Sequence, residues 1–128
     1  MRDNVELIEA LWDAFGRGDL DAMADAVADD AEIIFPASLP WGGIYRGPDG
    51  LRQVVADLRS RFADFKAKPE MVLGADDDHV VVVASLSGRG KRGARLEARA
   101  AWVYRLRAGE VIRGEAFADT AGLLQALG

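Results

Sequence analysis

The sequence predicts an α+β domain in which helices gather on one face of a largely antiparallel sheet. Two observations lead to this prediction. Apolar residues recur at helical spacing up to residue 62, apart from one short strand, whereas from Pro69 onward they alternate with a period of two. The alternating segments are separated by turns rich in Asp, Gly, Lys and Arg, which suit hairpins between antiparallel strands. A sheet that covers helices on one side must curve, so we expect a concave inner face.

Two helices are predicted before residue 30. Asp3 or Asn4 is placed to cap the first helix, which ends at the glycines at positions 16 and 18. Asp19 is placed to cap the second helix, which we expect to continue to residues 29–30. The apolar stripes of the two helices consist of Val5, Ile8, Leu11, Trp12 and Phe15, and of Leu20, Met23 and Val27.

A short strand and a long helix flank an aromatic loop. Residues 31–35 contain β-branched and aromatic side chains and are closed by Pro36, as at the end of a strand. The stretch 35–50, FPASLPWGGIYRGPDG, holds three prolines and four glycines with no apolar period. Pro48 suits the first turn of a helix. The apolar stripe of that helix consists of Leu51, Val54, Val55, Leu58 and Phe62. The loop therefore lies at the rim of the predicted concavity.

Four strands and a closing helix complete the predicted domain. The alternating pattern predicts strands over residues 70–75, 79–87, 94–106 and 110–118. Asp119 and Thr120 are placed to cap a last helix over residues 121–127. Because the 128 residues contain no repeat, linker or low-complexity segment, residues 1–128 are expected to form a single domain.

The turn at residues 107–109 decides which side chains of the last hairpin face inward. In a three-residue loop with a left-handed glycine in its final position, Leu106 pairs with Glu110. The inner face is then apolar or small, and it holds Trp102 and Tyr104.

A two-residue loop would shift this pairing by one and place Glu115 beside Trp102. The three-residue loop is favoured, because Ala108 is poorly suited to the positive φ that a two-residue loop requires.

Composition excludes several classes of function. The net charge of −5 argues against nucleic acid or an anionic membrane as the main partner. The absence of cysteine excludes disulfides, thiol catalysis and thiolate metal sites. The N-terminal stretch does not resemble a signal peptide, and no segment is long and apolar enough for a membrane span, so we expect a cytoplasmic protein.

Three phrases carry a family resemblance: GDLDAMADAVADDAEI, YRG leading into a helix, and a closing aspartate followed by LLQALG. With the order of elements, they resemble the SnoaL-like and ketosteroid-isomerase-like branch of the NTF2-like superfamily over nearly the whole chain. This resemblance implies a strongly curved, mostly antiparallel sheet wrapped around three helices from the N-terminal half. It also implies an apolar pocket inside the resulting cone and, frequently, a homodimer through the outer face of the sheet.

The same resemblance implies that the family's acid and base positions are replaced. Ketosteroid isomerases place a tyrosine and two acids at positions that match Leu11, Phe35 and Trp102. A further family tyrosine falls at Val55, and the acid shared by SnoaL-type cyclases and limonene epoxide hydrolases falls at Ala116. None of these side chains accepts a proton, so the inherited catalysis is expected to be weak or absent.

The candidate pocket residues are aromatic or aliphatic. Trp41 and Tyr45 either line the mouth of the pocket or merely cover the open end of the cone. Trp102 and Tyr104 either stack on a flat ligand or fill the core. The predicted pocket consists of Leu11, Phe15, Phe35, Trp41, Tyr45, Val55, Leu58, Trp102, Tyr104 and Ala116.

Few polar groups are candidates for chemistry, and these are Glu115, Tyr45 and Tyr104. If the last hairpin has the favoured loop, Glu115 instead pairs with Arg113 or Arg99 on the outer face. The acidic run 76–78 followed by His79 is read as a polar hairpin tip, because neighbouring strand residues point to opposite faces and cannot converge on a metal.

These observations leave three functions open. The first is a SnoaL-like protein that binds a small, largely apolar molecule without a cofactor. The second is an enzyme of the same fold, an isomerase, cyclase or hydrolase that uses other polar groups. The third is a protein-interaction module with a filled interior. In each case Ala101, Val103 and Phe117, on a face that nothing else covers, predict a homodimer.

Overall fold

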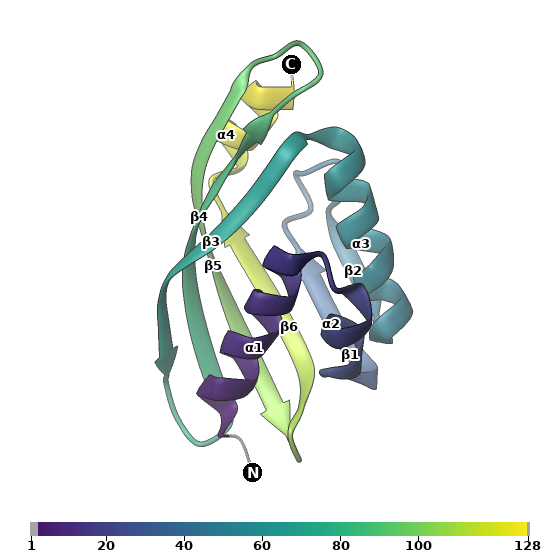
Figure 1. Cartoon of the computed structure of the whole chain (residues 1–128), viewed down its shortest axis with the longest axis vertical. Helices are drawn as coiled ribbons and strands as arrows, with labels where there is room; N and C mark the ends of the chain where they lie inside the picture. The colour runs from purple at the N-terminus through teal and green to yellow at the C-terminus, as the bar shows by residue number, and fades with distance from the viewer. Residues whose placement is uncertain (1–2, 128) are drawn as a thin grey trace.

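The computed structural model describes residues 3–127 as four helices and six strands (Figure 1). In chain order these are α1 (Asn4–Arg17), α2 (Leu20–Asp25), β1 (Val27–Phe35), β2 (Gly43–Arg46), α3 (Gly47–Arg61), β3 (Ala63–Gly74), β4 (His79–Arg89), β5 (Arg95–Arg107), β6 (Glu110–Ala118) and α4 (Thr120–Leu127). The strands form one sheet in the order β2-β1-β6-β5-β4-β3. All neighbouring strands are antiparallel except β1 and β6, which are parallel.

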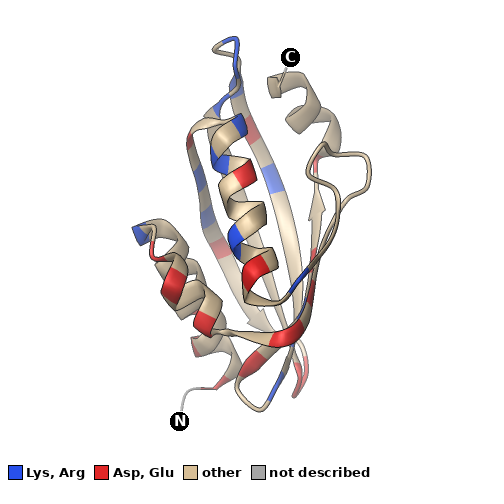
Figure 2. Ribbon diagram, turned by 90° about the vertical axis from the view of Figure 1, so that its right-hand side faces the viewer, with Lys and Arg blue, Asp and Glu red and all other residues tan. Residues whose placement is uncertain are grey.

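The sheet is strongly curved and open, and the helices lie on its concave side (Figure 1). Helix α1 packs against β3 and β4, and α3 packs against β1 and β2. Figure 2 shows α3 in front of the sheet, with acidic and basic positions along it. Helix α4 lies at the far end of the cone, against β5. The predicted α+β fold, with helices gathered on one face, is confirmed.

The predicted caps hold the ends of the helices. The Asp3 carboxylate accepts a hydrogen bond from the amide of Glu6 (2.8 Å), and the Asp19 carboxylate accepts one from Ala22 (3.1 Å). These bonds satisfy amides that have no partner inside the helix. At the C-terminal helix, Asp119 likewise accepts a hydrogen bond from the amide of Gly122 (3.0 Å).

Two boundaries differ from the prediction. The second helix ends at Asp25 rather than at residues 29–30, and Val27 begins β1. Pairing with β6 draws this segment into the sheet, since the amide of Val111 donates to the carbonyl of Ala26 (2.9 Å). The aromatic loop also contains a short strand, β2, which pairs with the end of β1. A four-residue edge strand beside glycines carries too little alternation to be predicted.

The last hairpin corrects the prediction for its turn. Arg107 pairs with Glu110, so the loop has two residues and not three. Ala108 adopts a φ of 51° and Gly109 one of 79°, as a two-residue loop requires. A bulge then adds one residue to β6, because Arg105 pairs with Arg113 whereas Leu106 pairs with Val111.

The bulge restores the predicted faces, although the pairing differs by two residues from the predicted one. Trp102 lies opposite Ala116, Tyr104 lies opposite Gly114, and Glu115 lies opposite Val103. The apolar inner face that holds Trp102 and Tyr104 therefore forms as predicted, with Glu115 on the outer face.

The interior is apolar from end to end. Two adjoining clusters of buried side chains fill the cone, one around Ile8 and Val82 and the other around Phe62 and Leu123. Among the residues that the structure describes, no charged side chain is buried. Within the same residues, no helix combines the length and apolarity that crossing a bilayer would need.

Candidate functional site

A cavity of about 100 Å³ lies between the inner faces of the helices and the concave face of the sheet. Residues of all four helices, five of the strands and the loop between β1 and β2 surround it, and none of them carries a charge. The lining residues are Leu11, Trp12, Phe15, Met23, Val27, Ile33, Phe35, Leu39, Trp41, Leu51, Val54, Val55, Leu58, Phe65, Ala67, Leu86, Ala100, Trp102, Tyr104, Val111, Gly114, Ala116, Ala118 and Leu123. Such a wall favours an apolar occupant.

Tyr104 brings a hydroxyl group into this apolar wall. Its side chain is 8% exposed, and its hydroxyl oxygen accepts a hydrogen bond from the indole N–H of Trp12 (3.1 Å). Burial raises the pKa of Tyr104 above its usual value, and the Trp12 hydrogen bond lowers it by less. The hydroxyl therefore stays protonated at neutral pH.

Glycine on the neighbouring strand makes room for the Tyr104 ring. Gly114 lies directly opposite Tyr104, and a Cβ atom at this position would stand 3.1 Å from two carbons of the ring. Any larger side chain would push the ring away from β6. The small residue that alternation places on the inner face thus helps to fix where the hydroxyl lies.

Two indole rings meet at the centre of the site. Trp12 and Trp102 contact edge to face, with ring centroids 4.8 Å apart and planes 78° apart. This geometry is favourable for aromatic pairs. The pair joins the inner face of α1 to the middle of β5, so it holds helix and sheet at a set distance across the cavity.

Most of the predicted pocket residues line this cavity. They are Leu11, Phe15, Phe35, Trp41, Val55, Leu58, Trp102, Tyr104 and Ala116. All nine are aliphatic or aromatic residues.

The two aromatic residues of the loop take different places. Trp41 is 3% exposed, lines the cavity and contacts Phe62 edge to face at 5.8 Å. Tyr45 is not part of the cavity wall that the described residues form. Its hydroxyl donates to the carbonyl of Trp41 (2.8 Å), so Tyr45 stabilises the loop through the loop's backbone. Burial raises the pKa of Tyr45, and the Asp57 carboxylate adds to this rise while Arg61 opposes it.

Glu115 lies outside the cavity. Its carboxylate accepts a hydrogen bond from Arg113 at 3.0 Å, and its side chain is 32% exposed. This is the outer-face ion pair predicted for Glu115, although the hairpin has a two-residue loop and a bulge.

The acidic run near His79 lies far from the cavity, at a hairpin tip. Asp76 accepts hydrogen bonds from the His79 ring (2.8 Å) and from the amide of Asp78 (2.9 Å), which lower its pKa. Among residues 3–127, no group of three or more acidic or histidine side chains converges as a metal site would require. The structure agrees with a polar hairpin tip.

Sequence reasoning missed part of the wall. Trp12 was placed on the buried stripe of the first helix but not in the pocket, although it belongs to the same stripe as Leu11 and Phe15. Phe65 and Ala67 were missed because the third strand begins at Ala63, earlier than predicted. Alternation with Lys66 and Lys68 was the available signal for this strand.

An open groove between α1 and β3 adjoins the cavity. The two hollows share Trp12, Phe15, Phe65 and Ala67. Arg59 borders this groove, with its guanidinium 5.1 Å from the centre of the Phe15 ring and a hydrogen bond to the Phe15 carbonyl (3.2 Å). These four shared side chains therefore separate the cavity from the groove.

A curved sheet, concave-side helices and an enclosed apolar cavity define an NTF2-like protein. A crystal structure of an NTF2-like protein from Burkholderia thailandensis superposes with a TM-score of 0.94 and 29% identity, covering 100% of this chain and 99% of that one. A structure described as a putative SnoaL-like polyketide cyclase from Jannaschia sp. CCS1 gives a TM-score of 0.84 at 23% identity, covering 97% and 90% of the two chains, which shows the shared fold.

The sequence places the chain more narrowly within this class. The SnoaL-like domain model matches residues 8–114, so the chain belongs to the SnoaL-like domain family. The uncharacterized protein Rv0034 of Mycobacterium tuberculosis is 29% identical over 121 residues, which span 92% of this chain and 91% of that protein. The resemblance found in the sequence is confirmed.

Proposed function

We propose that this SnoaL-like protein binds a small, largely apolar molecule in the cavity and performs no ketosteroid-isomerase chemistry. The observation that carries the proposal is the uncharged wall, in which the Tyr104 hydroxyl and indole N–H groups are the polar side-chain atoms. An apolar cavity favours an apolar ligand over water.

The wall also argues against inherited catalysis. Isomerisation needs a base within hydrogen-bond reach of the transferred proton and a donor for the developing enolate. Leu11, Phe35 and Ala116 supply neither group, and Trp102 offers a donor only.

The alternative of an enzyme that uses other groups has less support. The hydroxyl of Tyr45 is bound to the Trp41 carbonyl outside the cavity, and Glu115 is paired on the outer face. Tyr104 faces the cavity, but its raised pKa keeps the hydroxyl protonated at neutral pH, so no phenolate is available to act as a base. The interaction module with a filled interior is disfavoured by the cavity itself.

Native mass spectrometry of the purified protein tests the proposal. We expect a bound small molecule whose mass appears beside that of the free chain. Ala116→Leu fills the cavity next to Trp102, and this variant should lose the ligand. Ala56→Leu, the same substitution at an exposed position of α3, should retain it.

Two results would contradict this proposal. One is a fully occupied ligand in the Ala116→Leu variant, which would place the ligand elsewhere. The other is a fragment collection in which no small apolar compound raises the melting temperature of the wild-type protein more than that of the Ala116→Leu variant.

A further inference from the structure

We infer that the ligand of this cavity is a neutral molecule with a carbonyl or similar acceptor oxygen, which binds to the Tyr104 hydroxyl. The inference rests on the proposed function and makes its chemical class specific. It depends on the direction of one buried hydrogen bond and on the kinds of polar group around the cavity.

The Tyr104 hydroxyl has a proton to donate and, within the described part of the chain, no acceptor for it. An indole N–H is a donor only, so in the contact at 3.1 Å Trp12 donates and the Tyr104 oxygen accepts. No second partner of this hydroxyl is found among residues 3–127. The proton of a side chain that is 8% exposed is therefore left for an occupant of the cavity that Tyr104 lines.

Accepting a hydrogen bond also makes the hydroxyl a better donor. Hydrogen bonds in a chain polarise one another, and this effect is larger away from water. The Trp12 N–H thus prepares Tyr104 to donate, and the edge-to-face contact of Trp12 with Trp102 holds the indole in place.

The side chains around the cavity offer donors and almost no acceptors. Besides Tyr104, the polar side-chain groups of the wall are the indole N–H groups of Trp12, Trp41 and Trp102. A ligand that must donate, such as an amine or an ammonium ion, would lose its hydrogen bonds to water without replacement.

Anionic ligands are disfavoured for a different reason. The wall contains no cation to offset the loss of hydration that a carboxylate suffers on burial. A neutral acceptor avoids this cost and satisfies the buried Tyr104 proton. Carbonyl compounds with an apolar body combine both properties.

Four probes of similar size separate these cases: acetophenone, ethylbenzene, benzoate and benzylamine. Dissociation constants are measured by NMR titration for the wild-type protein and for Tyr104→Phe. We expect the preference for acetophenone over ethylbenzene to fall about five- to tenfold in Tyr104→Phe. Ethylbenzene makes no hydrogen bond, so the ratio of the two dissociation constants removes any effect of a general loosening of the cavity, which weakens both probes alike.

Tyr45→Phe is the matched control, since it removes the other tyrosine hydroxyl of the chain, which lies outside the cavity. In Tyr45→Phe, the preference for acetophenone over ethylbenzene should equal that of the wild type. The infrared band of the bound acetophenone carbonyl gives a second readout that needs no variant. This band should lie at lower frequency than that of acetophenone in hexane.

The outcomes separate the inference from the function on which it rests. Binding of both uncharged probes with equal ratios in wild type and Tyr104→Phe, or an unshifted carbonyl band, would overturn the inference and keep the proposed function. Tighter binding of benzoate or benzylamine than of acetophenone would also overturn it. If none of the four probes binds, the proposed function fails for molecules of this size, and the inference fails with it.

Discussion

The two tyrosines of this chain show how position decides the chemistry of one residue type. Tyr104 projects from β5 onto the concave face, where burial and a single indole partner surround its hydroxyl. Tyr45 lies on the edge strand β2, where its hydroxyl binds the backbone of the loop. The first is placed to contact a ligand and the second to brace the wall.

The buried hydroxyl predicts a loss of stability at alkaline pH. Burial raises the pKa of Tyr104 in the folded protein, so between the unfolded pKa near 10 and the folded value the unfolded chain loses this proton first. The free energy of unfolding is therefore unaffected by this group below pH 10. Between pH 10 and the folded pKa it falls by about 1.4 kcal/mol per pH unit.

Urea unfolding between pH 8 and 11 measures this effect. Tyr104→Phe should flatten the decline above pH 10, and Tyr45→Phe should flatten it less, because Tyr45 is less buried. Equal pH slopes in the wild type and in Tyr104→Phe would show that this hydroxyl ionises freely in the folded protein.

Residue-level prediction from sequence succeeded where periodicity sets the direction of a side chain. Leu11, Val55 and Leu58 face the cavity because helical spacing places them on an inner stripe. The contact between Trp12 and Tyr104 was not predictable, since it joins residues 92 positions apart through the curvature of the sheet. Tyr45 was predicted in the pocket, but it lies opposite Ile33 on the edge strand β2 and packs against the Phe35 ring beside the cavity wall, at a strand that the sequence did not reveal.

At the level of elements, the β5–β6 hairpin shows that two local deviations can cancel. A two-residue loop alone would have turned Glu115 inward, and the bulge at Ile112 turns it out again. The faces predicted from a three-residue loop are therefore correct although that loop length is wrong, because the two deviations cancel. Bulges have no comparable sequence signal, so the pairing itself was missed.

The strained turn predicts a stabilising substitution. Ala108 occupies the left-handed region at φ 51°, where its Cβ atom is unfavourable. Asparagine tolerates this region and precedes glycine in the preferred two-residue loops. Ala108→Asn should therefore raise the free energy of unfolding by about 1 kcal/mol in a denaturant titration.

A second exposed turn provides the comparison. Ala94 lies in the β4–β5 turn without a positive φ, so Ala94→Asn relieves no backbone strain and should bring no gain. A loss of stability in Ala108→Asn would mean that the hairpin does not close through the two-residue loop.

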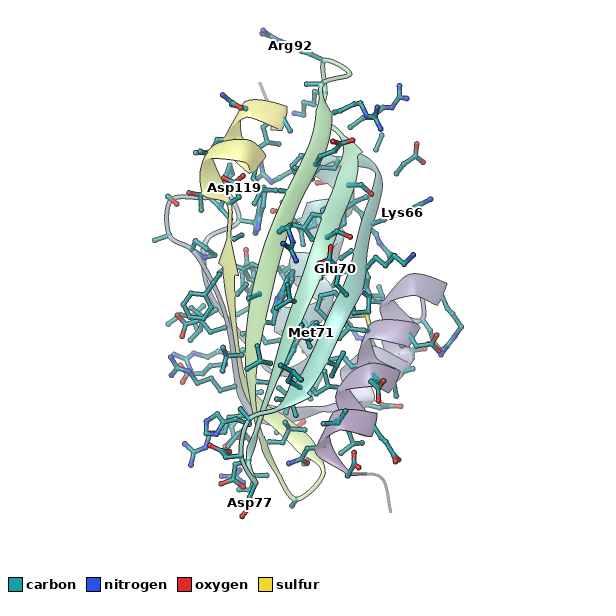
Figure 3. The ribbon with its side chains drawn as sticks, turned by 90° about the vertical axis from the view of Figure 1, so that its left-hand side faces the viewer. Lys66, Glu70, Met71, Asp77, Arg92 and Asp119 are labelled. Atoms are coloured by element: carbon teal, nitrogen blue, oxygen red, sulfur yellow. The ribbon has the colours of Figure 1, made fainter. Side chains whose placement is uncertain are left out.

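At the scale of the whole molecule, the outer face of the sheet exposes large apolar side chains. Figure 3 looks onto this face, where no helix covers Glu70 or Met71. A row of directly opposed apolar residues crosses four strands, with Met71 50% and Phe117 52% exposed. This row consists of Met71, Val83, Ala101 and Phe117, and the next row adds Leu73, Val81 and Val103.

We propose that two copies of the chain associate through these rows. The charges beside them form ion pairs of opposite sign, Arg99 with Glu70 and Arg113 with Glu115. A second copy would thus meet an apolar surface with a balanced rim, without a concentration of like charge. A twofold axis would bring the same patch of each copy together.

Phe117→Glu tests this arrangement, because in a twofold interface it places two carboxylates among apolar side chains. Light scattering coupled to size-exclusion chromatography should show a dimer for the wild type and a monomer for this variant. Leu124→Glu, on the exposed side of α4, should remain dimeric. A wild-type protein that stays monomeric at high concentration, or a Phe117→Glu variant that dimerises as well as the wild type, would show that this face does not join two copies. Since Phe117 points away from the cavity, the monomeric variant should still bind the ligand, which separates assembly from binding.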